Sequence, residues 1–111
     1  EALGPAWAAA RVYAALDKTK APLARAEMLA FLQKLVVDFG AGPLRPQRLA
    51  PAAVAELGNS NPKVRGAAVE LLGALHRRLG PPLRALLGDL GAAAAAVEAE
   101  FEKVGFDPSL A

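Results

Sequence analysis

"NSNPKVRGAAVELLGALHRRLG", residues 59–80, is the stretch that decides the fold class. Its apolar residues recur at intervals of three and four, the period of one face of an α-helix. The members of this stripe are Val64, Ala68, Leu71, Leu72, Leu75 and Leu79. Pro62 suits the first turn of a helix, where its missing N–H costs nothing, and Gly80 suits the end. We therefore predict a helix over residues 62–79 that buries one long face.

The composition favours helices throughout the chain. The 111 residues suit one domain or a piece of a larger protein, and a chain that opens on Glu1 is expected to be such a piece. Alanine, leucine and charged helix formers dominate, whereas β-branched and aromatic residues are scarce. Cysteine is absent, which excludes disulfides and thiolate metal sites. The single histidine, His76, makes a zinc site or a histidine-based triad improbable.

Charge is distributed unevenly along the chain. The formal net charge is only +2, but residues 11–84 carry 12 basic and 5 acidic side chains, and residues 85–111 carry 1 basic and 5 acidic. A basic body with an acidic tail indicates an acidic partner, either a protein surface or nucleic acid. The longest nearly apolar run, residues 91–97, is too short to cross a membrane, and we see no signal peptide. The default expectation is therefore a cytosolic protein.

Prolines and glycines divide the chain into segments of helical length. The predicted helices cover residues 5–16, 22–39, 47–57, 62–79, a short segment near 82–88 and a longer one near 91–104. Residues 22–40 match residues 62–80 at a constant offset of 40. The matched pairs are Pro22/Pro62, Arg25/Arg65, Leu29/Val69, Leu32/Leu72, Leu35/Leu75, Phe39/Leu79 and Gly40/Gly80. A short helix precedes each long one, and a period near 40 is typical of HEAT-like repeats.

This repeat predicts an all-α fold, an α-solenoid of HEAT-like helical hairpins with a C-terminal capping helix. We assign residues 5–40 to the first repeat, 47–80 to the second and 82–104 to the cap. Stacked hairpins bury the apolar faces that a single hairpin leaves open. In the cap, the predicted inward stripe is Val97, Phe101 and Val104, and the side chains predicted to face mostly outward are Glu98, Glu100 and Glu102. The side of the stack toward the N-terminus is left open.

The turns within the two hairpins are short, polar and basic. Stacking would align them along one edge, about 10 Å apart, where cations on rigid turns suit an acidic partner. The candidate binding residues are Lys18, Thr19 and Lys20 in the first turn and Asn61, Lys63 and Arg65 in the second.

Several of these residues also have a structural interpretation. Asn and Ser before Pro62 fit ordinary helix capping, and Arg25 and Arg65 fit the bracing of neighbouring repeats through an acidic group. Lys18, Lys20 and Lys63 have no obvious structural task. We expect His76 at a helix surface or interface, and Trp7 and Tyr13 in the core.

Two stretches resemble a known family. "NPKVRGAAVELLGALHRRLGPPLRALLGDL" and the later "VEAEFEKVGFDP" are similar to the C-terminal part of a TOG domain. They look most like the third TOG domain of chTOG-type microtubule polymerases, in the plant and green-algal form. "LVVDFG", at the end of predicted helix 22–39, resembles the penultimate repeat of such a domain. The resemblance covers residues 8–107 and is most specific in the C-terminal half.

This resemblance implies the fifth and sixth repeats of a six-repeat domain, followed by a C-terminal helical extension. It implies binding of αβ-tubulin along the turn edge, growth of microtubule plus ends together with other TOG domains of the same parent chain, and location on cytoplasmic microtubules and the spindle. It implies no cofactor. Lys18 and Lys20 then stand in the turn where the family presents basic contacts to tubulin, and Lys63 and Arg65 in the last turn. The aromatic that the family inserts into tubulin belongs to a first repeat that this chain lacks, so weak affinity is expected. The resemblance leaves open whether this domain binds tubulin or only supports the array.

Other functions remain open at this stage. The chain could be a generic HEAT-repeat scaffold that binds a helix or peptide through the apolar flank at its N-terminal side. A nucleic-acid-binding repeat is disfavoured by the low net charge, and a dimerisation module would use the open face of the stack. No P-loop, GxSxG motif or convincing carboxylate pair is present, so we expect no enzymatic activity. We likewise expect no metal, nucleic acid or membrane partner.

Overall fold

The structure is a computed structural model that describes residues 4–40, 45–80, 83–87 and 90–105. Every regular element in these ranges is helical, which confirms the predicted all-α class. The elements are α1 (Pro5–Lys18), α2 (Pro22–Phe39), α3 (Pro46–Glu56), α4 (Pro62–Leu79), α5 (Arg84–Leu87), the 3₁₀ helix η3 (Gly91–Ala93) and α6 (Ala94–Val104).

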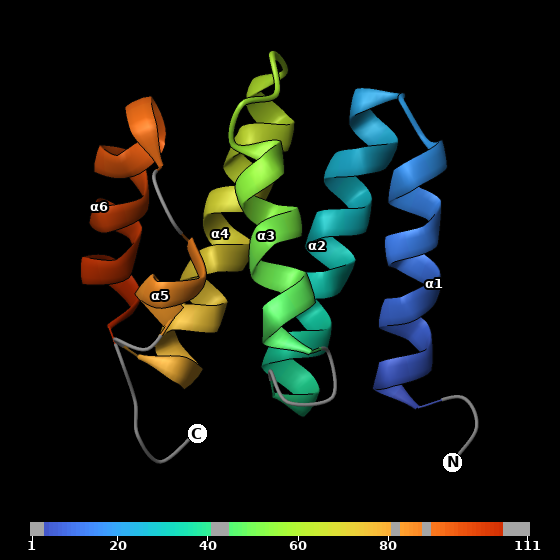
Figure 1. The fold of residues 1–111 in the computed structure, drawn as a ribbon, viewed down its shortest axis with the longest axis horizontal. Helices are drawn as coiled ribbons and strands as arrows, with labels where there is room; N and C mark the ends of the chain where they lie inside the picture. Colours follow the sequence, from blue (N-terminus) through green and yellow to red (C-terminus); the bar gives the residue numbers. More distant parts are fainter. Residues whose placement is uncertain (1–3, 41–44, 81–82, 88–89, 106–111) are drawn as a thin grey trace.

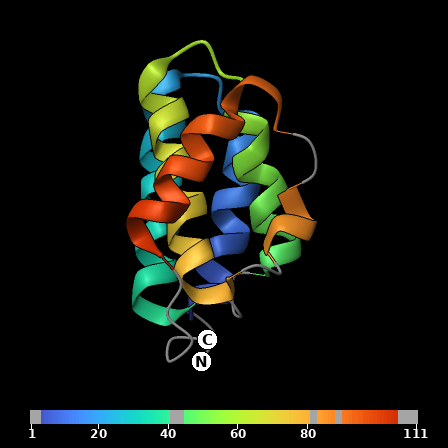
Figure 2. The ribbon, with the colours of Figure 1, turned by 90° about the vertical axis from the view of Figure 1, so that its left-hand side faces the viewer.

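The helices form two layers of a solenoid. Figure 2 shows α2, α4 and α6 in one layer and α1, α3 and α5 in the other. In Figure 1 the hairpin of α1 and α2 stands beside the hairpin of α3 and α4, with α5 and α6 beyond. The long helices α2 and α4 form the most extensive contact, and α6 packs along the other side of α4. This arrangement confirms the HEAT-like stacking, whereas the exact division into repeats and cap stays a prediction.

The core lies where the two layers meet. The apolar stripe predicted for helix 62–79 is buried from Val64 to Leu75, and its last member, Leu79, is partly buried. The largest fully buried side chains come from both layers and include Leu29, Leu32, Leu49, Leu71, Leu72, Leu75, Leu83 and Val97. Burying one leucine side chain contributes about 2 kcal/mol. Every hairpin therefore depends on its neighbours for its apolar contacts.

Local sequence signals explain where the helices begin and end. A proline occupies the first turn of α1, α2, α3 and α4. Gly40 and Gly80 follow α2 and α4 with φ angles of 85° and 69°, which glycine adopts without steric cost. The predicted ranges 22–39 and 62–79 agree with the structure.

The other boundaries differ slightly from prediction. Helix α1 continues to Lys18, so this lysine belongs to the last helical turn and not to the connecting loop. Helix α3 is shifted by one residue, to Pro46–Glu56. The predicted segment 91–104 divides into η3 and α6, and the segment 82–88 contracts to α5, its first and last residues lying outside the described ranges.

The core assignment of Trp7 was wrong, whereas that of Tyr13 is confirmed. Helix α1 packs through Ala9, Tyr13 and Leu16, which recur at helical spacing. Trp7 precedes Ala9 by two residues, so it lies on the opposite side of the helix, where it is 46% exposed. The guanidinium of Arg11 covers its ring at 5.1 Å.

Helix α6 buries two of its three predicted inward residues, and of its three predicted outward glutamates Glu102 is exposed. Val97 and Phe101 are buried and Glu102 is exposed, as expected, and Val104 and Glu98 are partly buried. Glu100 is also partly buried because it lies across Gly73 of α4, where an added Cβ would come within 2.7 Å of its Cγ.

His76 takes the interface role that the sequence allowed. Its ring stacks on Phe101 with centroids 4.3 Å apart, and its Nδ1 lies 3.0 Å from the carbonyl oxygen of Gly105. It is therefore buried where α4 meets α6.

Candidate partner-binding edge

The turns within the two hairpins lie at the same end of the solenoid. Figure 1 shows the connection between α1 and α2 and the connection between α3 and α4 side by side at the top of the molecule. Lys18 ends α1 and Lys63 stands in the first turn of α4, so the candidate cations of both hairpins share this end. We call this surface, made by Lys18–Lys20 and Asn59–Arg65, the turn edge.

Arg25 hydrogen-bonds both to the turn of the first hairpin and to α3 of the second hairpin. Its guanidinium donates to both carboxylate oxygens of Glu56, from Nε at 3.2 Å and from the second terminal nitrogen. The remaining nitrogen donates to the carbonyl oxygens of Leu16 at 2.7 Å and Thr19 at 2.5 Å. Glu56 is only 6% exposed. The bidentate, charge-assisted pairing with Arg25 provides hydrogen-bond donors for both oxygens of this buried carboxylate. The sequence-based interpretation of Arg25 as a brace between hairpins is consistent with this geometry.

Arg65 occupies the matching position in the repeat but bonds differently. Its guanidinium donates to the carbonyl oxygens of Asn59 at 2.8 Å and Ser60 at 2.9 Å, both in its own turn. Within the described part of the chain no acidic side chain bonds it, so the predicted acidic brace stays a prediction for Arg65. Ala96 stands 40 residues after Glu56, and an alanine offers no carboxylate.

Two of the predicted binding residues also organise the turns. The Asn61 side chain caps α4 by accepting the backbone N–H of Lys63 at 2.9 Å. The Asn59 side chain in turn accepts the N–H of Asn61 at 2.8 Å. The backbone carbonyl oxygen of Thr19 accepts a hydrogen bond from Arg25. These bonds hold the backbone of both turns in one conformation.

The three lysines of the turn edge project into solvent. Lys18, Lys20 and Lys63 are all exposed. No acidic side chain whose position the structure describes lies within ion-pair distance of any of them. The edge therefore offers three cations, together with Arg65, to an acidic partner.

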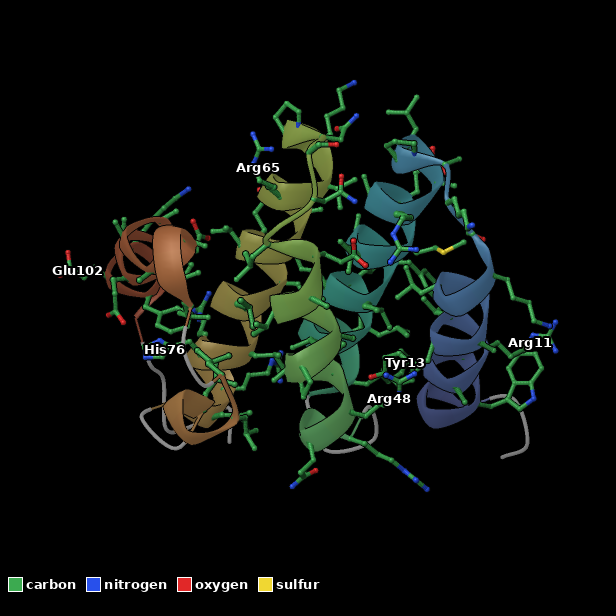
Figure 3. The ribbon with its side chains drawn as sticks, turned by 45° about the horizontal axis from the view of Figure 1, so that its top comes forward. Arg11, Tyr13, Arg48, Arg65, His76 and Glu102 are labelled. Carbon is green, nitrogen blue, oxygen red and sulfur yellow. The ribbon has the colours of Figure 1, made fainter. Side chains whose placement is uncertain are left out.

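A second contact between the two hairpins joins Tyr13 of α1 to Arg48 of α3, and it is structural. Arg48 of α3 stacks over the Tyr13 ring at 4.8 Å, as Figure 3 illustrates. Burial raises the pKa of Tyr13 from its ordinary 10.0 to about 12, and the positive charge of Arg48 lowers it in part. Tyr13 is therefore a neutral core residue that joins α1 to α3.

In the described ranges, no three His, Cys, Asp or Glu side chains lie close enough together to hold a metal ion. None of the described helices has the length and apolarity that crossing a membrane requires.

Comparison with known proteins finds relatives among plant proteins. The chain is 32% identical over 113 residues to Protein MOR1 of Arabidopsis thaliana, a match that covers 100% of this chain and 6% of that protein. It is 29% identical over 109 residues to Protein MOR1 of Oryza sativa subsp. japonica, covering 96% of this chain and 6% of that protein. The chain thus spans about 6% of the length of these relatives. No family model matches, and no solved structure matches.

Sequence reasoning found the cations of the turn edge but missed Glu56. This residue is the one acidic side chain between Asp38 and Glu70, and it stands at the end of a short helix next to a turn. The available signal for the Arg25–Glu56 pair was this isolated acidic residue at the end of the helix, together with an arginine near the start of the preceding helix.

Proposed function

We propose that this chain is a TOG-type, microtubule-associated binding module whose turn edge contacts αβ-tubulin. The observation that carries the proposal is the common placement of Lys18, Lys20 and Lys63, exposed on two turns that share one end of the solenoid. Thr19, Asn61 and Arg65 complete the contact surface. The matches to the MOR1 proteins support a microtubule-associated protein of the TOG family, without deciding which domain the chain represents.

The electrostatics of the edge suit this partner. Lys18, Lys20 and Lys63 form no ion pair with any acidic side chain that the structure describes, so they keep their attraction for an acidic protein surface. A braced backbone also loses little entropy when it binds. In this proposal the chain promotes microtubule growth at plus ends by binding tubulin, with no cofactor and no catalysis of its own. Other TOG domains of the parent protein would act beside it, on cytoplasmic microtubules and the spindle.

Charge reversal tests the proposal directly. The variant Lys18→Glu/Lys20→Glu/Lys63→Glu should lose binding of fluorescently labelled chain to αβ-tubulin, measured by anisotropy. The matched control Lys34→Glu/Arg77→Glu/Lys103→Glu changes the net charge equally at exposed positions away from the turn edge, and it should retain most binding. Added salt should weaken the wild-type interaction. Equal loss of tubulin binding in both variants would show that only net charge matters and that the turn edge is not the binding site.

A second candidate is a HEAT-repeat scaffold that binds another protein without tubulin. The exposed apolar side chains of the first hairpin favour it: Trp7 is 46% exposed and Phe31 43%. If this candidate holds, Trp7→Ala and Phe31→Ala should abolish capture of the partner, while the Lys→Glu triple variant should have no effect. Tubulin binding that depends on the turn edge and not on Trp7 would rule it out.

A further inference from the structure

A groove of about 800 Å³ runs beside the first half of α4, beginning at Lys63 and Arg65 of the turn edge and continuing away from it toward Glu70 and Glu100. Apolar and small residues form much of its lining, among them Gly66, Ala67, Val69, Ala93 and Ala96. Figure 3 shows Arg65 on the side of α4 that faces α6. Arg65 is one of the residues that line the groove. The volume falls in the range of cavities that accept small ligands or a short stretch of chain.

The helices after α4 form a pair, α5 and α6, that is shorter than the two hairpins before it. Its first helix, α5, has only four residues and packs near one end of α3, whereas α1 and α3 extend along their partners. Facing small residues then leave the space unfilled. A Cβ on Gly66 would meet nothing within 4 Å, and Ala96 is exposed.

The charges around the groove have opposite signs at different places. Lys63 and Arg65 line the groove at the turn edge. Glu70 of α4 and Glu100 of α6 line it farther from that edge. No acidic side chain with a described position pairs with Lys63 or Arg65. A complementary ligand therefore carries negative charge at one end only and is apolar behind it. A nucleic-acid backbone, with charge along its whole length, would meet Glu70 and Glu100.

We propose that this groove binds a short segment of a partner protein in which acidic residues precede apolar ones. The carboxylates of the segment pair with Lys63 and Arg65. Its apolar side chains occupy the space beside Gly66, Ala67 and Ala96. This binding site goes beyond the tubulin contact, because it lies on the flank between α4 and α6 and uses apolar burial as well as charge.

A defined peptide tests the proposal. The probe is a fluorescein-labelled peptide in which two glutamates precede a leucine and an isoleucine between Gly-Ser flanks, with binding followed by anisotropy. Gly66→Leu and Ala96→Leu each fill the groove from a different helix without touching a cation, and each should weaken binding about tenfold. Ala30→Leu adds the same group at an exposed position on α2 and should leave binding unchanged. A peptide with two lysines in place of the glutamates should not bind.

The alternative outcomes are distinct. Equal affinity of wild type and both groove-filling variants would overturn the proposal, as would equal binding of the lysine peptide. Tighter binding of a DNA duplex than of the peptide, or self-association of the chain that Gly66→Leu abolishes, would assign the groove to another occupant. The tubulin proposal is separable, since Lys18→Glu/Lys20→Glu should weaken tubulin binding but leave the peptide bound, and Gly66→Leu should do the reverse. Circular dichroism of each variant confirms that the helices are retained.

Discussion

At the scale of single residues, the ion pair of Arg25 and Glu56 links the first hairpin to the second. Removing one partner of a buried ion pair strands the other charge, which costs far more than the loss of an exposed pair. We predict that Arg25→Ala lowers the free energy of unfolding by about 3 kcal/mol in urea denaturation. Arg65→Ala, at the matching position of the repeat, should cost less than about 1 kcal/mol because Arg65 is exposed. Similar costs for both would contradict the bracing role of Arg25.

Tyr13 gives a second prediction at this scale, and it is the single tyrosine of the chain. Its pKa is raised to about 12 by burial, so tyrosinate absorbance at 295 nm should appear near pH 12 in the folded protein. The unfolded chain releases the same proton near the ordinary value of 10.0. The contribution of Tyr13 to stability is therefore complete below pH 10 and is lost as the pH rises toward 12. Titration near pH 10 in protein that is still folded would show that Tyr13 is not buried as described.

At the scale of elements, two glycines of α4 make opposite predictions. Gly66 faces open space, so Gly66→Ala should raise the free energy of unfolding by about 0.5–1 kcal/mol through helix propensity. Gly73→Ala should lack this gain, because the new Cβ would lie 2.7 Å from the Cγ of Glu100 on α6. In a Glu100→Ala background, Gly73→Ala should recover the gain in thermal or urea denaturation. Equal stabilisation at both glycines without that background would contradict the close contact between α4 and α6.

The elements also show how far the sequence could predict the structure. The ends of α2 and α4 follow from proline and glycine, which act locally, and these boundaries agree with prediction. Trp7 was misplaced because a large apolar residue favours burial only on the packed side of its helix, and that side depends on tertiary contacts. The partner of Arg25 and the position of Glu100 over Gly73 likewise depend on which helices meet. The groove beside α4 is lined by small residues of α4, η3 and α6, so it likewise depends on which helix faces meet.

At the scale of the whole molecule, stacking converts two separate basic turns into one surface. The hairpins stand side by side, and both turns reach the same end of the solenoid. The bonds of Arg25, Asn61 and Asn59 fix the backbone of those turns, and the lysines extend from it. We therefore predict that tubulin is recognised by the two turns together and that neither turn is sufficient alone.

Nuclear magnetic resonance of the ¹⁵N-labelled chain, titrated with unlabelled αβ-tubulin, tests this claim most directly, because line broadening reports even weak binding to a large partner. Recognition by both turns predicts that the amide signals of Lys18–Lys20, Asn59–Asn61 and Lys63–Arg65 broaden first and together, while those of Lys34, Arg77 and Lys103 persist longest; Pro62 has no amide proton. Broadening confined to one turn, or centred on residues far from the turn edge, would contradict it, as would spectra that tubulin leaves unchanged.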